Sequence, residues 1–126
     1  MEQFVLILAQ IFVAIVAIEH IIILWMEMFA WETLGRKVFK SALAEELFTP
    51  TKGLAANQGL YNGFLAAGLI WSLMISDHVW KHNIALFFLG CVVIAGLYGA
   101  LTASKRIFYT QALPAIIAIV LVLLAR

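Results

Sequence analysis

Charged residues are scarce in this sequence. Only 12% of the 126 residues are Asp, Glu, Lys or Arg, whereas 65% are hydrophobic. Soluble domains carry about 25% charged residues, so this composition excludes a soluble globular fold. The net charge of +1 also offers no basic surface to a nucleic acid. We therefore expect a membrane protein that has membrane lipids as partners and does not bind nucleic acid.

Cysteine and proline are also rare. The single cysteine, Cys91, excludes an intrachain disulfide, and we interpret it as a packing residue. One of the two prolines, Pro50, precedes Gly53 and breaks the chain before an apolar stretch.

Four apolar stretches are long enough to cross a bilayer, whose hydrocarbon core of about 30 Å requires about 20 helical residues. They cover residues 3–31, 54–76, 83–101 and 107–125, and the only long connection is 32–53. The first stretch has no basic region before it and exceeds the length of a signal peptide, so we expect a retained helix. The sequence thus predicts one all-α transmembrane domain, 1–126, folded as a four-helix up-down bundle.

Basic residues predict the orientation of this bundle. Lys81 and Arg126 belong to the side of the termini, whereas the two loops on the other side hold Arg36, Lys37, Lys40, Lys52, Lys105 and Arg106. Short loops rich in Lys and Arg stay in the cytoplasm. We expect the loop 32–53 inside and both termini outside. Within this loop, Leu43, Leu47 and Phe48 have the spacing of a short interfacial helix.

Three ionisable residues lie in the first stretch: Glu19, His20 and Glu27. A charge at mid-membrane costs about 2.5–3.5 kcal/mol on insertion scales, so such groups usually face the bundle interior. His20 and Glu27 lie about 20° apart around a helix, whereas Glu19 is turned about 100° from His20. Glu27 could instead reach water near the helix end, and Glu19 with His20 could form a structural hydrogen-bonded pair between helices.

Metal or haem ligation by His20 is a further reading, but it lacks a second histidine in the membrane. His78 and His82 fall in the predicted connection 77–82 on the opposite side. No nucleophile with an adjacent base and no phosphate-binding glycine loop accompanies them. We expect neither a metal site nor a cofactor.

The second stretch has a polar face beside a face of small residues. Asn57, Gln58, Tyr61 and Asn62 span an arc of about 140°. Gly59 and Gly63 have the spacing that lets two helices approach closely, either within the chain or across a homodimer. We expect intrachain packing for these two glycines and polar contacts for the other face.

Opposite helix directions bring these polar positions to one depth in the cytoplasmic half. We therefore predict one polar pocket with an apolar outer half, which argues against an open channel. Its predicted members are Glu19, His20, Glu27, Asn57, Gln58, Tyr61, Asn62, Tyr98 and Gln111.

Several of these residues belong to a family pattern. The Glu19-His20 pair, Glu27-Met28-Phe29, residues 54–67 (LAANQGLYNGFLAA) and residues 111–115 (QALPA) resemble the bacterial domain-of-unknown-function 1304 family. This resemblance implies a small, four-helix, multi-pass protein of the bacterial cytoplasmic (inner) membrane. It implies no assigned activity that could be transferred to these positions.

Three functions are compatible with the pattern. A hydrophobic or lipid-like ligand could enter the pocket, with Glu19, His20 and Tyr61 as candidates for binding or for acid–base catalysis of the kind that moves a double bond. Alternatively, Glu19 could exchange protons with a cationic substrate, as in small multidrug exporters, although the long first loop and the one-sided polar residues count against this. In the third reading the polar groups only lock the helices of an accessory protein together.

Overall fold

The computed structural model describes all 126 residues, and all of its secondary-structure elements are helices, as predicted. Its α-helices are α1 (Glu2–Phe29), α2 (Arg36–Val38), α3 (Lys52–Met74), α4 (His78–Thr102) and α5 (Leu113–Ala125). The π-helical turns η1 (Trp31–Gly35) and η3 (Phe108–Ala112) and the 3-10 turn η2 (Glu45–Leu47) complete the elements. There are thus five α-helices rather than the predicted four, because the predicted loop 32–53 contains the short helix α2.

The start of α4 differs from the predicted helix boundary by five residues. The sequence predicted a start at residue 83, but α4 begins at His78. Oδ2 of Asp77 accepts a 2.9 Å hydrogen bond from the backbone N–H of Trp80, which satisfies a free donor of the first turn. The prediction that His78 and His82 lie in a loop was therefore wrong, since both lie in the first turns of a helix.

Two π-helical turns modify the other long helices. The α-helix α1 ends at Phe29, where Ala30 leaves helical geometry with φ −135° and ψ 26°, and η1 follows. At the other end of the chain, η3 precedes α5. Pro114 lacks a backbone N–H, so it interrupts the α-helical hydrogen-bond ladder at the point where the wider turn occurs. The predicted helix 107–125 is therefore a π-turn followed by an α-helix.

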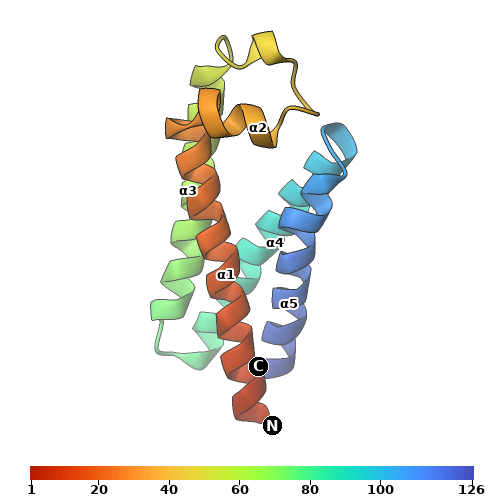
Figure 1. Ribbon diagram of the computed structural model, residues 1–126. Coiled ribbons are helices and arrows are strands. Elements are labelled where there is room, and N and C mark those ends of the chain that lie inside the picture. Colours follow the sequence, from red (N-terminus) through yellow and green to blue (C-terminus); the bar gives the residue numbers. More distant parts are fainter.

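Figure 1 shows the long helices side by side. The helix α1 packs against α3 and α5, and α4 also packs against both of them. Both termini and the turn between α3 and α4 lie at one end, here called the terminal end. The segment 30–51 and the connection between α4 and η3 lie at the opposite, loop end. The α1–α3 pair and the α4–α5 pair converge at the terminal end and separate toward the loop end (Figure 1).

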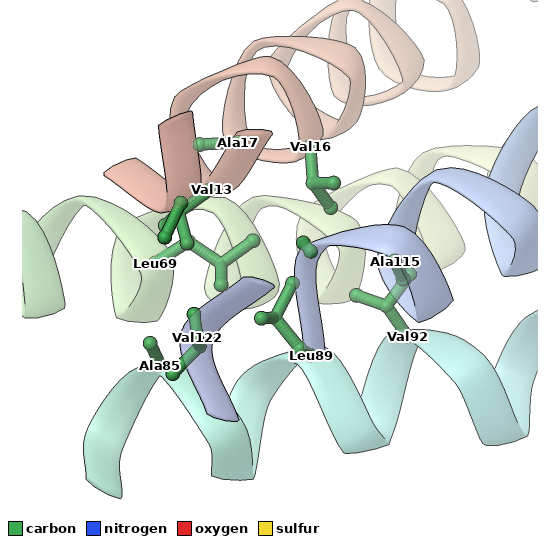
Figure 2. Packing of buried hydrophobic residues seen from close by; sticks show 11 residues of the cluster. Val13, Val16, Ala17, Leu69, Ala85, Leu89, Val92, Ala115 and Val122 are labelled. Atoms are coloured by element: carbon green, nitrogen blue, oxygen red, sulfur yellow. The ribbon is translucent and has the colours of Figure 1, made fainter. Parts of the chain in front are cut away.

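Small apolar residues close the terminal half of the molecule. Figure 2 shows this cluster, to which α1, α3, α4 and α5 all contribute. Its eleven buried members are Ala9, Val13, Val16, Ala17, Leu69, Ala85, Leu89, Val92, Ala115, Ala118 and Val122. Alanine and valine side chains allow close helix contact. The helices consequently leave little space between them in this half.

Three helical segments, α1, α4 and residues 108–125, are long and apolar enough to cross a membrane. This is compatible with a multi-pass membrane protein. The helix α3 does not meet the same criterion, although the sequence analysis counted it as a span. Its first half is polar, since it contains Lys52, Asn57, Gln58 and Asn62.

The loop 32–53 is folded around Phe48, whose side chain is fully buried. The Phe48 ring lies 5.2 Å from that of Trp31, and the Arg36 guanidinium lies 5.6 Å from its centroid. Arg36 donates a 2.6 Å hydrogen bond to Oε1 of Glu45 and a 3.1 Å hydrogen bond to the hydroxyl of Thr49. The interfacial helix expected over 43–48 is absent, because Phe48 packs inward and only the short turn η2 forms.

Candidate functional site

A cavity of about 610 Å³ lies between the separated helices of the loop half. Eleven of its 21 lining residues are hydrophobic. The α1 wall consists of Glu19, Ile23, Met26 and Glu27, whose spacing places them on one helical face. The segment after α2 contributes Phe39, Ser41 and Ala42, so the folded loop forms part of the cavity wall.

The α4 wall explains why this space is not filled. Its lining residues are Cys91, Ala95 and Gly99, which recur every four positions and present only small side chains. The polar lining residues of α3 and of the η3 region are Gln58, Tyr61, Asn62, Arg106, Thr110 and Gln111. The cavity is therefore lined by polar residues on several sides, and the small side chains of α4 leave space along that helix. Cys91 lines it, whereas the sequence analysis interpreted this residue as a packing residue.

Glu27 is buried, with 3% of its surface exposed. Its Oε1 accepts a 2.6 Å hydrogen bond from the side-chain amide of Asn62 on α3. A buried carboxyl group needs such a partner. The alternative in which Glu27 extends to water near the helix end is therefore wrong.

Glu19 and His20 have different environments although they are adjacent. His20 is 1% exposed, and its Nδ1 lies 2.8 Å from the backbone oxygen of Val16 in the same helix. Oε1 of Glu19 lies 3.9 Å from that nitrogen, too far for a hydrogen bond, and has no other hydrogen-bond partner although the atom is buried. His20 therefore bonds within α1 rather than to another helix, whereas Glu19 lines the cavity with 28% of its side chain exposed and keeps its unpaired Oε1 buried.

Six of the predicted pocket residues line this cavity: Glu19, Glu27, Gln58, Tyr61, Asn62 and Gln111. His20, Asn57 and Tyr98 are not among the lining residues. His20 is packed between helices, whereas Asn57 and Tyr98 are exposed on the outer surface. Of the catalytic candidates, Glu19 and Tyr61 thus share the cavity without His20.

Sequence reasoning missed the lining residues contributed by the connections. Arg106 was counted only as a basic loop residue, and Ser41 and Ser104 were not considered, whereas Thr110 was expected at the depth of the polar half. Arg106 and Thr110 lie four positions apart, at the spacing of one helical face. This spacing in the sequence could have indicated that Arg106 and Thr110 line the same side of the cavity.

The two predicted packing glycines of α3 lie against α1. A Cβ atom on Gly59 would be 2.8 Å from Cγ of Met28 and 3.0 Å from Cβ of Glu27. A Cβ atom on Gly63 would clash with Cδ1 of Leu24. The close approach therefore occurs within the chain, and it brings Asn62 within reach of Glu27.

Two histidines lie together at the terminal end, outside the cavity. The rings of His78 and His82 are 4.2 Å apart, and both ring nitrogens of the buried His82 lack a hydrogen-bond partner. No group of three or more His, Cys, Asp or Glu side chains is placed to hold a metal ion. A histidine pair without a third ligand provides no dedicated metal site.

The family model described as "Protein of unknown function (DUF1304)" matches residues 14–123. The chain belongs to this family. It is also 33% identical over 115 residues to the "Uncharacterized protein YpaA" of Lactococcus lactis subsp. lactis (strain IL1403), an alignment that covers 90% of this chain and 95% of the relative. No solved structure matches the chain. All residues that line the cavity fall within the matched DUF1304 region.

Proposed function

We propose that this DUF1304 protein is a four-helix transmembrane bundle that binds a small amphiphile from the surrounding membrane in its loop-half cavity. The observation that carries the proposal is the cavity of about 610 Å³ with its mixed lining. Sites for small ligands measure about 300–1,000 Å³ and combine apolar walls with a few polar groups. An amphiphile has both an apolar part and a polar part to match such walls.

The membrane part of the proposal includes α3 as the fourth span. Its 23 residues extend for about 35 Å at 1.5 Å per residue, enough to cross the hydrocarbon core. Asn62 is bonded to Glu27, and Gln58 and Tyr61 line the cavity. Asn62, Gln58 and Tyr61 thus have a partner or a cavity within the protein, as a spanning helix requires, whereas the exposed Lys52 and Asn57 lie in the first two turns of α3 at the loop end.

The rim of the cavity favours entry from the membrane. Tyr61 and Phe64 line it with 59% and 54% of their surfaces exposed, and their rings are in edge-to-face contact at 5.5 Å. In the proposed bundle these apolar groups face the lipid chains, so an amphiphile reaches the cavity without crossing water.

A cavity-filling variant tests this function. The Ala95→Phe substitution places a ring in the cavity, whereas Ala67→Phe adds the same ring to an exposed position of α3 that does not line it. Each protein is purified in mild detergent, and the amphiphiles that copurify are extracted and measured by mass spectrometry. We expect a bound amphiphile with the wild-type and Ala67→Phe chains and its loss with Ala95→Phe. Equal amounts in all three samples would show that lipid binds elsewhere.

A proton-coupled transporter is the second candidate, because Glu19 places a carboxyl group of α1 in the cavity lining. Transport requires a path through the terminal half, which the buried cluster around Leu69 and Leu89 closes. Flux measurements in proteoliposomes with an imposed proton gradient distinguish this candidate. Substrate flux that is abolished by Glu19→Gln would favour the transporter over a binding protein. Absence of both flux and bound amphiphile would favour the accessory role, in which bonds such as Asn62–Glu27 only join helices.

A further inference from the structure

The charges in the cavity wall allow the ligand's polar group to be specified. We infer that the cavity takes an amphiphile whose head is a protonated primary amine, with Glu19 as the residue that binds it. This inference rests on the proposed binding function. It adds the chemical class of the ligand, which the mixed lining alone does not determine.

Acidic residues outnumber basic residues around the cavity. Two carboxyl groups, Glu19 and Glu27, belong to the α1 wall, whereas Arg106 is the one basic residue in the lining. Arg106 is exposed near the connection between α4 and η3. Glu19 lies eight positions before Glu27, hence about 12 Å deeper along α1. The deep part of the cavity therefore favours a cation.

The two carboxyl groups have different environments. Oε1 of Glu27 is already bonded to Asn62, whereas the buried Oε1 of Glu19 has no partner. Glu19 lines the cavity with 28% of its side chain exposed, so its carboxyl group is free to accept an N–H from a ligand there. A hydrogen bond between charged groups is stronger than one between neutral groups.

Hydrogen bonding favours a primary amine over a quaternary ammonium group. An ammonium group has three N–H donors, whereas a quaternary ammonium group has none. Gln58, Tyr61 and Gln111 supply further oxygen atoms in the lining. The exposed rings of Tyr61 and Phe64 at the rim suit the apolar tail. A primary amine can thus bond to Glu19 and to neutral oxygens while its tail extends toward the rim.

Four probes with the same alkyl tail test the inference: octylamine, octyltrimethylammonium, octanol and octanoate. Their binding to the full-length protein in nanodiscs is measured by titration calorimetry near pH 7, with empty nanodiscs to subtract partitioning into lipid. We expect octylamine to bind about tenfold or more tightly than each of the other three, which corresponds to one charge-assisted hydrogen bond. Glu19→Gln should remove this preference, whereas Glu2→Gln, on the same helix but outside the cavity, should retain it.

The outcomes separate this inference from the proposed function. Equal affinity for octylamine, octyltrimethylammonium and octanol, all lost in Ala95→Phe, would overturn the inference and leave the binding function intact. Tighter binding of octanoate would also overturn it. Absence of binding by all four probes, together with no copurifying amphiphile, would overturn both. If Glu19→Gln does not fold, Glu19→Asp takes its place, and an undiminished preference for octylamine in this shortened side chain would count against Glu19 as the binding residue.

Discussion

The side-chain amide of Asn62 donates a 2.6 Å hydrogen bond to Oε1 of Glu27 and so joins α3 to α1 across 35 positions of sequence. Glu27 is 3% exposed, so its carboxyl group depends on this partner. Gly59 lies one turn before Asn62 and allows the two helices to approach closely. The glycine and the hydrogen bond therefore belong to the same helix contact.

Removing the donor of this bond should destabilise the protein. We expect Asn62→Leu to lower the free energy of unfolding by about 1 kcal/mol or more, because the buried acceptor loses its partner. Glu27→Gln is the matched control, since its amide oxygen can accept the same bond. Both variants are compared with the wild type by reversible unfolding in detergent. An Asn62→Leu chain as stable as the wild type would mean that the bond contributes nothing to the fold.

The glycines predict opposite effects of one added methyl group. Gly59→Ala should destabilise by about 1–3 kcal/mol, because the new Cβ meets Cβ of Glu27 at 3.0 Å and the backbone oxygen of Leu24 at 3.1 Å. Gly90→Ala, with nothing within 4 Å of the new Cβ, should stabilise α4 by about 0.5–1 kcal/mol. Unfolding in detergent measures both changes, and a common sign would contradict the packing argument.

Helix existence and depth could be predicted from the sequence, because apolar length and helix direction determine both. Glu27 and Asn62 lie far apart in sequence, yet antiparallel helices place them at one depth, as Gln111 also shows by lining the same cavity. The rotation of each helix about its own axis, which determines the side chains that face the cavity, could not be predicted from length and direction. The arc predicted for α3 included Asn57, which is exposed outside the cavity. A rotation is fixed by packing of neighbouring helices, which single-helix patterns do not contain.

The loop was the part least accessible to prediction. Its fold depends on contacts between residues of different segments, such as Trp31 with Phe48 and Arg36 with Glu45. Periodicity within 43–48 favoured an interfacial helix, but burial of Phe48 against Trp31 determined the observed turn. The start of α4 could have been predicted, since Asp77 before His78 is a helix-capping signal in the sequence. The predicted start at residue 83 followed the limit of the apolar stretch instead.

Arg36 should control the order of this loop. Its side chain also donates a 2.6 Å hydrogen bond to the backbone oxygen of Glu32, so it connects both ends of the loop. We expect Arg36→Ala to accelerate backbone hydrogen exchange over residues 39–51 severalfold while exchange in α4 and α5 stays unchanged. Lys37→Ala, on an exposed neighbour, is the control and should have little effect. Equal acceleration in both variants would indicate general loosening rather than loss of the Arg36 contacts.

Protonation of Glu32 at low pH should weaken the contacts that hold the same loop. The hydrogen bond from the Thr49 hydroxyl, followed by the contact with Lys52, holds the pKa of Glu32 below its usual value. A carboxyl group with a depressed folded-state pKa stabilises the fold fully above its ordinary pKa of about 4.3, and this stabilisation is lost as the pH falls through the lower folded value. Hydrogen exchange over 45–51, corrected for the intrinsic pH dependence, should therefore be constant from pH 7 to about 5 and rise below about 4. In Glu32→Gln the rise in exchange below about pH 4 should be smaller than in the wild type. An unchanged rise would show that other groups cause it.

The orientation of the protein can be tested with single cysteines at its two ends. Cys91 is first replaced by alanine, and one cysteine is then introduced at Glu2 or at Lys40, both of which are exposed. These positions lie at the terminal end and the loop end, and the loop end also contains Arg36, Lys37, Lys105 and Arg106. Loops with this excess of basic residues stay in the cytoplasm. A membrane-impermeant maleimide should therefore label the cysteine at position 2 in intact spheroplasts and the one at position 40 only after permeabilisation. The reverse pattern would retain the spanning bundle with the opposite orientation, whereas labelling of both from one side would mean that α1 does not cross the membrane and that the cavity does not open to lipid as proposed.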